Sequence, residues 1–260
     1  MSAIAVIFVS VLLGASPNLG EALVGPARFA PMYPAPNEPE AVDIPAFHLD
    51  TRPVTNEEFL AFVVGHPRWQ RDRIARIYAD VGYLEYWAGS LTLGPPAAHN
   101  KPSQPVTRVS WYAAKAYCAA AGKRLPTELE WELAAAADET QQDVRSVPEA
   151  QERLLAWYGR PTHETPAVGS GPANVWGIHD LHGLVWEWVY DFNTTLVTGD
   201  PREGGGTDLT QFCGAGALAA SDGADYASFM RYALRSSLSA GFTMRNLGFR
   251  CARTAVPISK

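Results

Sequence analysis

Two histidines and a glutamate stand close together in the segment from Asn174 to Phe192, which reads NVWGIHDLHGLVWEWVYDF. His179 and His182 are three residues apart, a spacing that places two imidazoles side by side on one helical turn. Glu187 follows five residues after His182. Two imidazoles and a carboxylate suit zinc or non-haem iron. The pattern is also common in structural turns, so these residues alone leave both a metal site and a turn open.

The composition is that of a globular chain. Of its 260 residues, 47% are hydrophobic and 18% charged, which allows a sizeable core in one large domain or two small ones. The formal net charge of −6 provides no basic field for a phosphate backbone, so nucleic acid is not expected as a partner. The many tryptophans, glycines and prolines indicate a domain rich in loops.

The N-terminal residues predict export. Ala3 to Ala15 is apolar and uncharged, too short to cross a bilayer comfortably but suited to the apolar region of a signal peptide. Gly20 and Ala22 frame a small-x-small cleavage site. We expect a signal peptide at 1–22, an arm at 23–41, a periplasmic or otherwise exported location, and no stable membrane span after signal removal. No Lys or Arg precedes the apolar run, so a misassigned start or a buried strand remain alternatives.

Two capping boxes predict helices. Thr55 is followed three residues later by Glu58, and Thr127 is followed by Glu130 in the same way. In such a pair the threonine accepts a hydrogen bond from the third helical N–H, and the glutamate accepts one from the threonine N–H. Each helix should therefore begin directly after its threonine.

A third helix is expected between Ser110 and Gly122, because serine is a favoured N-cap and glycine a favoured C-terminal stop. It should turn Trp111, Ala114 and Cys118 toward the core.

The remaining chain is expected to be irregular. Residues 42–50 and 247–253 alternate as strands do. The segment 66–94 is rich in charge and aromatics and reads as an insertion wrapped over the surface, and 138–160 reads as a polar surface excursion.

Four ordered segments carry a family resemblance. They are PVTNEEFLAFV at 53–63, PVTRVSWYAAKAYCAAAGKRLPTELEWE at 105–132, NVWGIHDLHGLVWEW at 174–188 and NLGFRCAR at 246–253. In this order they resemble the landmarks of the formylglycine-generating enzyme family, also called sulfatase-modifying factors. The resemblance implies one α+β domain at 42–255, a variant of the C-type lectin fold with few regular elements and many loops. It also implies that His182 lies in a turn rather than on a metal.

The three cysteines are Cys118, Cys213 and Cys251. In an oxidising compartment one disulfide and one thiol is the economical arrangement, but spacing alone does not choose the pair. The resemblance implies a bridge between Cys118 and Cys251. Cys213 then remains as the one available thiol and a candidate catalytic residue, although no nucleophilic triad is indicated around it.

The copper site of the family is not expected here. Formylglycine generators hold copper between two cysteines, and the resemblance places those positions at Ala219 and Ala224, with the family serine at Gly216. Cu(I) needs soft thiolate ligands, which alanine does not provide.

Calcium is the better-supported metal by resemblance. Glu187 matches a glutamate that helps to bind a structural calcium ion in the family, and calcium prefers oxygen ligands. Leu184 stands where the family has an asparagine, which removes one of those ligands.

A substrate groove is implied at Arg231, Arg235 and Ser236. The planar guanidinium groups could bind a peptide backbone or a carboxylate. The alternative is that the arginines pair with Asp222 or Asp225.

The function expected from these features is that of an exported accessory or maturation factor. Softer motifs, including FCGAGAL and MRYALRSSLSAGFT, resemble exported relatives associated with nitrite reductase clusters and pyoverdine maturation. The expected partner is an exported client protein or a peptide-derived product. The alternatives are a metal-dependent oxidase and a non-catalytic module that binds a ligand in a lectin-like groove. Trp186 and Trp188 are expected to be core aromatics.

Overall fold

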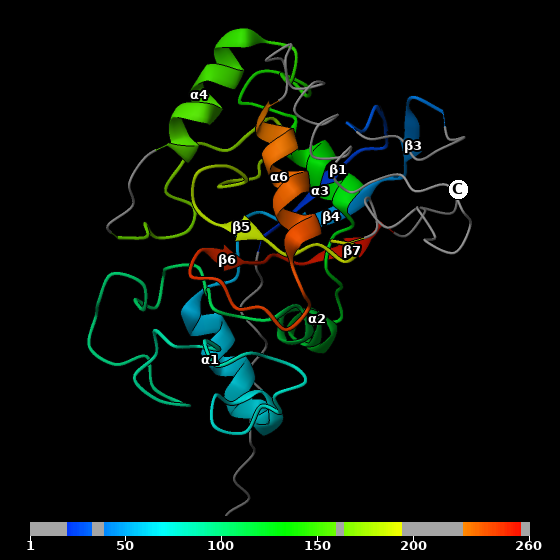
Figure 1. Cartoon of the computed structure of the whole chain (residues 1–260). Helices are drawn as coiled ribbons and strands as arrows, with labels where there is room; N and C mark the ends of the chain where they lie inside the picture. Colours follow the sequence, from blue (N-terminus) through cyan, green and yellow to red (C-terminus); the bar gives the residue numbers. More distant parts are fainter. Residues whose placement is uncertain (1–19, 33–38, 160–163, 194–225, 256–260) are drawn as a thin grey trace, which may run out of the picture.

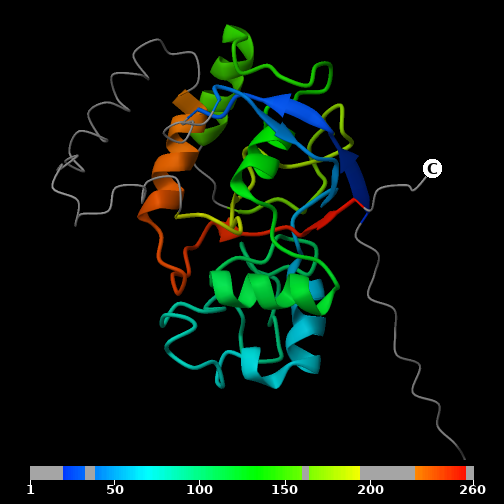
Figure 2. The same cartoon turned by 90° about the vertical axis from the view of Figure 1, so that its right-hand side faces the viewer.

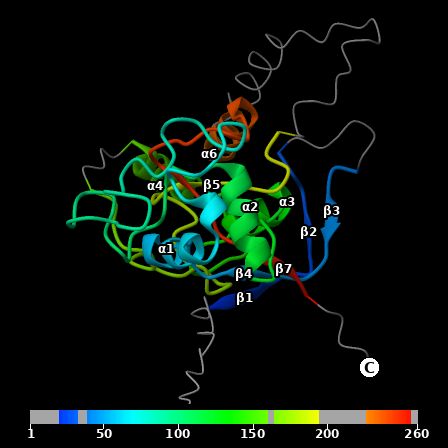
Figure 3. The same ribbon diagram turned by 90° about the horizontal axis from the view of Figure 1, so that it is seen from below.

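The computed structural model describes residues 20–32, 39–159, 164–193 and 226–255. Its largest sheet has three strands in the order β1-β4-β7. β4 (Phe47–Asp50) lies in the middle and pairs antiparallel with both β1 (Glu21–Val24) and β7 (Ala252–Thr254). The sheet runs along one edge of the molecule in the view from below (Figure 3). It therefore joins the first and last described segments of the chain.

Two smaller sheets complete the strands. β2 (Ala27–Phe29) pairs antiparallel with β3 (Val42–Ile44), and β5 (Trp186–Glu187) pairs in parallel with β6 (Leu247–Gly248). Residues 20–29 are therefore part of the fold. The domain boundary expected at residue 42 lies inside the folded unit, because strand pairing holds much of the expected arm against the rest of the domain.

The described helices are short. They are α1 (Asn56–Gly65), the 3-10 helix η1 (Pro67–Trp69), α2 (Trp111–Ala120), α3 (Glu128–Ala135), α4 (Pro148–Tyr158) and α6 (Tyr226–Ser237). Both capping boxes form as predicted, with Thr55 and Thr127 each bonded reciprocally to the glutamate three residues later. In the described part of the chain, no helix is long and apolar enough to span a membrane.

α2 begins and ends where the sequence predicts. The Ser110 side chain accepts a hydrogen bond from the Ala113 N–H at its start. At its end Gly122 takes a positive φ of 71°, which glycine adopts without strain. The N–H of Lys123 donates to the Cys118 carbonyl at 2.8 Å, closing a Schellman motif. This stop fixes Lys123 beside the disulfide.

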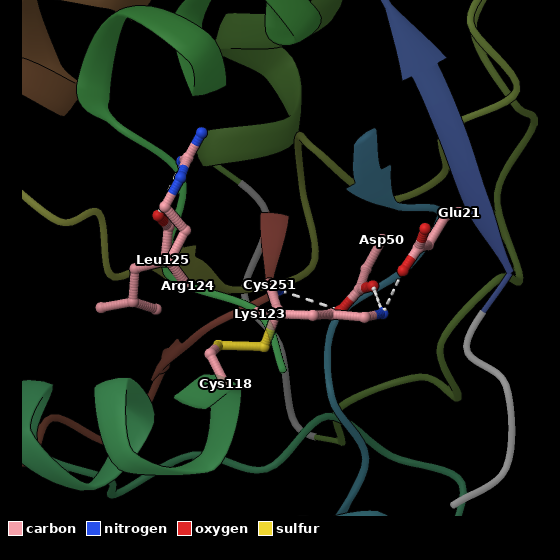
Figure 4. The surroundings of a disulfide bond; sticks show 7 residues. All are labelled: Glu21, Asp50, Cys118, Lys123, Arg124, Leu125 and Cys251. Atoms are coloured by element: carbon pink, nitrogen blue, oxygen red, sulfur yellow. Dashed lines mark hydrogen bonds and ion pairs between the residues drawn. A yellow bond between two sulfur atoms is a disulfide. The ribbon is translucent and has the colours of Figure 1, made fainter. Parts of the chain in front are cut away.

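The predicted disulfide between Cys118 and Cys251 is present, with Cα atoms 5.5 Å apart. It ties α2 to the residue before β7, closing a sequence separation of 133 residues. In the chain-entropy model such a loop contributes about 5 kcal/mol. Beside the bridge, Lys123 reaches between Asp50 and Glu21, at 2.6 and 2.8 Å (Figure 4). Glu21 on β1 therefore belongs to the ion cluster that surrounds the bridge.

The core lies on both sides of the segment that carries β6 and β7. Figure 2 shows α1 and α2 on one side of this segment and α3 and α6 on the other. Phe249 between the two strands is fully buried and packs edge-on against Phe59 of α1 and Tyr117 of α2. The segment NLGFRCAR at 246–253 thus supplies the centre of the core.

The segment 66–94, expected to wrap over the surface, is exposed at Ile77 and Val81 but is also anchored in the core. Trp69, Tyr83, Leu84 and Trp87 are all buried, and the Trp87 indole donates to the Asn56 side chain at 2.9 Å. Burial of these large apolar side chains outweighs the exposure of the arginines between them.

The expected surface excursion at 138–160 contains a regular helix, α4, which begins with Pro148 at its first position. Proline suits that place because its missing N–H would have no helical partner there. α4 lies beside α6 (Figure 1).

Candidate functional site

Two glutamates of α3 face two arginines of α6 in a buried ladder. Glu128 and Glu132 are four residues apart, as are Arg231 and Arg235, so each pair lies on one face of its helix. Arg231 donates two hydrogen bonds to the Glu132 carboxylate, from Nε at 2.9 Å and from Nη2 at 2.7 Å. Arg235 Nη1 lies 2.6 Å from Glu132 and 3.3 Å from Glu128. The expected alternative partners, Asp222 and Asp225, lie outside the described residues.

Glu132 is the electrostatic centre of this ladder. Burial alone would raise the pKa of its carboxyl, but the charges and hydrogen bonds of Arg231 and Arg235 outweigh burial and lower that pKa to about 2. Trp131 packs beneath the guanidinium groups, with Arg235 4.6 Å from the ring centroid. The ladder stays charged across the physiological range.

Arg235 has one engaged edge and one open edge. Its Nη1 is bonded to the two glutamates, whereas Nε and Nη2 have no hydrogen-bond partner among the described residues. The residue is 4% exposed and lines a pocket of about 120 Å3 with Trp131, Tyr158 and Trp186. The Nε and Nη2 edge of an arginine matches a carboxylate bidentately.

The two other residues expected in this groove are placed differently. Arg231 is 3% exposed, and besides Glu132 it contacts Ser228 and the Tyr158 hydroxyl. The Ser236 hydroxyl donates to the Ala233 carbonyl of its own helix at 2.9 Å. Arg235 is therefore the one of the three that lines the pocket.

The tryptophans near Glu187 have separate roles. Trp188 is fully buried, as expected of a core aromatic, and its indole donates to the Val109 carbonyl at 2.9 Å. Trp186 is half-buried and stacks on Tyr158 with ring centroids 5.1 Å apart. Trp186 packs against the core and also forms a wall of the small pocket.

His179 and His182 do not converge. The segment is a turn in which Asp180 has a φ of 59°. His179 Nδ1 donates to the Gly171 carbonyl, and His182 Nε2 donates to the Ala135 carbonyl, each at 2.8 Å. Burial and the Arg231 charge lower the pKa of His182 to about 4, so its ring is neutral at pH 7. Both histidines fix backbone in a turn.

Comparison with known proteins decides the family. The model of the sulfatase-modifying factor enzyme 1-like domain matches residues 17–255. A formylglycine-generating enzyme of Streptomyces coelicolor is 32% identical over 277 residues, covering 91% of this chain and 87% of that protein. The chain belongs to the sulfatase-modifying factor family.

Other members of the family have different activities. A hercynine oxygenase of Mycolicibacterium thermoresistibile is 36% identical to this sulfatase-modifying factor protein over 172 residues, covering 60% of this chain but 39% of that protein. The fold is also similar to that of Treponema denticola variable protein 1, with a TM-score of 0.52 at 20% identity over 90% of this chain and 95% of that one. The predicted family and fold class are confirmed.

The residues around Glu187 do not fit the calcium ion that the family resemblance implies. Arg250 binds the Glu187 carboxylate bidentately, and the Trp131 indole donates to it at 2.8 Å. Both ionic side chains are fully buried. A cation would have to displace Arg250, and Leu184 offers no side-chain oxygen in place of the family asparagine.

The positions expected for the copper ligands and the catalytic thiol are known from the sequence alone. Cys213, Gly216, Ala219 and Ala224 lie outside the described residues. Within the described ranges, no group of three or more His, Cys, Asp or Glu side chains is arranged to hold a metal ion.

Sequence reasoning missed Glu128 and Glu132, although a signal was present. Two glutamates four residues apart lie in a helix whose other residues are mostly apolar, and two arginines share the same spacing on α6. Matching spacings of opposite charge on two helices predict a ladder between them.

Proposed function

We propose that this sulfatase-modifying factor protein is an exported accessory factor that acts on or binds a client protein or a peptide-derived product. It works without the dithiolate copper centre of a formylglycine generator. The family to which the chain belongs includes an oxidative enzyme, the hercynine oxygenase of Mycolicibacterium thermoresistibile.

The disulfide is the observation that carries this proposal. The chain has three cysteines, and two of them are bonded to each other. One thiol remains, Cys213, so one chain cannot supply the two thiolates that Cu(I) needs at the family site. The sequence supports the same conclusion, because alanines stand at 219 and 224, where the resemblance places the two copper-binding cysteines.

Ligand binding is proposed at the pocket of Arg235. The open Nε and Nη2 edge has no acceptor among the described residues, and aromatic side chains line the pocket around it. A buried arginine with unpaired donors binds an anionic ligand favourably, because folding has already removed water from the guanidinium group. A carboxylate on a peptide or peptide-derived molecule matches this pocket.

The test uses the full chain, isolated from the periplasm with its disulfide intact. It is incubated with copper and a Cys-containing sulfatase peptide, and the peptide mass is measured. The expected result is no formylglycine. In parallel, a short peptide with a free C-terminal carboxylate is compared with its amide by calorimetry, and the carboxylate form should bind more tightly.

The matched variant is Arg235→Lys, which retains the charge beside Glu132 and loses the planar fork. It should reduce the preference for the carboxylate form while the circular dichroism spectrum stays native. Formation of formylglycine would overturn the proposal. Equal binding of the two peptides would overturn its carboxylate part.

A further inference from the structure

A second cavity, of about 630 Å3, lies between α4, the end of α3 and the segment 164–184. This volume suits a small organic molecule. Most of its walls are hydrocarbon, supplied by Val144, Leu154, Trp157, Ile178 and Leu181. It adjoins the Arg235 pocket, and Trp157 contributes to both.

The walls of this cavity are fixed by internal hydrogen bonds. The Asn174 side chain donates to the Ala134 carbonyl at 2.8 Å and accepts from the Ile178 N–H at 3.1 Å. His182 binds the Ala135 carbonyl. Gly183 allows the Trp157 indole to lie against the turn, since a Cβ there would come within 2.8 Å of the ring. These contacts fix the shape of the cavity.

The charges that line the cavity are unbalanced. Of the residues that the structure describes, four carboxylates line it, at Asp138, Glu139, Glu164 and Asp180, with a single arginine, Arg153.

Two of those carboxylates have cationic partners. Arg153 pairs with Asp138 at 3.5 Å, and Lys101 pairs with Glu164. Glu139 and Asp180 have no cationic partner among the described residues. Asp180 accepts one hydrogen bond, from the Gly169 N–H.

His182 adds no positive charge to the wall, because its ring is neutral at pH 7. Within the described ranges, the cavity therefore combines a hydrocarbon interior with two carboxylates that have no cationic partner. Such a surface repels anions and leaves carboxylates that a cation would neutralise. A metal ion is a poorer match, since it needs more oxygen ligands than two carboxylates and hydrocarbon walls provide.

We propose that this cavity binds an organic cation, with an ammonium or guanidinium group at Glu139 and Asp180 and a hydrocarbon body against Leu154, Trp157 and Leu181. The inference deepens the proposed function, since the cation would belong to the same peptide-derived ligand or client, for instance as a lysine side chain. It concerns a separate cavity, so its test does not depend on Arg235 or on copper.

The test compares three probes of one length, hexylammonium, hexanol and hexanoate, by calorimetry on the full chain at low ionic strength. Hexylammonium should bind about tenfold more tightly than hexanol, and hexanoate should bind least. The double variant E139Q/D180N keeps the hydrogen-bonding shape and should lower hexylammonium affinity to that of hexanol. The control E40Q/E57Q changes two exposed glutamates outside the cavity and should leave all three affinities unchanged.

A variant that fills the cavity tests whether hexylammonium binds there. Ala156 is exposed on α4 and lines the cavity, so A156W should be tolerated and should abolish binding of hexylammonium. Arg235→Lys should leave that binding unchanged, which separates this inference from the carboxylate proposal. Equal affinity for hexylammonium and hexanol, an unchanged affinity in E139Q/D180N, or binding that survives A156W would each overturn it.

Discussion

Arg250 and Glu187 form a fully buried, bidentate ion pair, with Nε to Oε2 and Nη2 to Oε1 both at 2.8 Å. Arg250 also donates to the carbonyls of Asp50 and His179. The Arg250 side chain thus joins β4, the turn that carries His179, and β5. The pair holds together the segments that surround the candidate site.

Removal of one member of this pair should be costly. Glu187→Gln leaves the Arg250 charge buried without its counter-ion, so we expect a loss of about 3–5 kcal/mol in the free energy of unfolding. Denaturant titration measures this loss. The control is Asp143→Asn at a partly exposed ion pair with Arg145, where we expect about 1 kcal/mol or less. A small effect at Glu187 would contradict the structural role.

The same pair predicts the response to calcium. Because Arg250 occupies the carboxylate, addition of calcium or of a chelator should leave the thermal midpoint of the wild-type protein unchanged. Thermal scans check this directly. A rise in midpoint with calcium that Glu187→Gln abolishes would restore the calcium site.

Glu132 should make stability depend on pH in the acid range. Its folded pKa of about 2 lies below its ordinary value of 4.5, so the unfolded chain binds a proton first as pH falls. The stabilisation is therefore complete above pH 4.5 and is lost between 4.5 and 2. Glu132→Gln should cost about 3 kcal/mol at pH 7. A deficit that stays constant down to pH 2 would contradict the ladder.

His182 should affect a higher pH range. Its folded pKa of about 4 lies below its ordinary value of 6.5, so protonation favours the unfolded chain and stability falls from pH 6.5 toward 4. The loss should be about 2 kcal/mol, allowing for the partly exposed ring. His182→Gln should remove this part of the pH dependence in denaturant titrations at several pH values. An unchanged slope would mean that folding does not lower the pKa of His182.

Local signals in the sequence predicted local structure well. Thr55 and Thr127 start helices and Gly122 ends one because caps act through neighbouring backbone groups. The disulfide was predictable only through family resemblance.

The contacts that the sequence did not predict join distant segments. Arg231 meets Glu132 across 99 residues, and Glu21 meets Arg253 across 232. No local propensity encodes such pairs. The pairing of Glu187, the expected calcium ligand, with Arg250 was therefore visible only in the fold. The burial of Trp87 was missed for the same reason.

The position of β1 constrains where an export signal can be cut. Cleavage after Ala22 would divide this strand and remove Glu21, which binds both Lys123 and Arg253. If the protein is exported, mature chains should therefore begin at Gly20 or earlier. N-terminal sequencing of periplasmic protein measures the cut. A mature terminus at Leu23 would contradict this account.

We propose that this sulfatase-modifying factor protein has no dithiolate copper site, and a Cu(I) competition titration tests this proposal most directly. The wild-type chain with its disulfide intact should take no tightly bound Cu(I) from a chelator. The double variant A219C/A224C, which restores the two family cysteines, should bind one Cu(I) per chain, and A219S/A224S should bind none. Stoichiometric, tight Cu(I) binding by the wild-type chain would contradict the account.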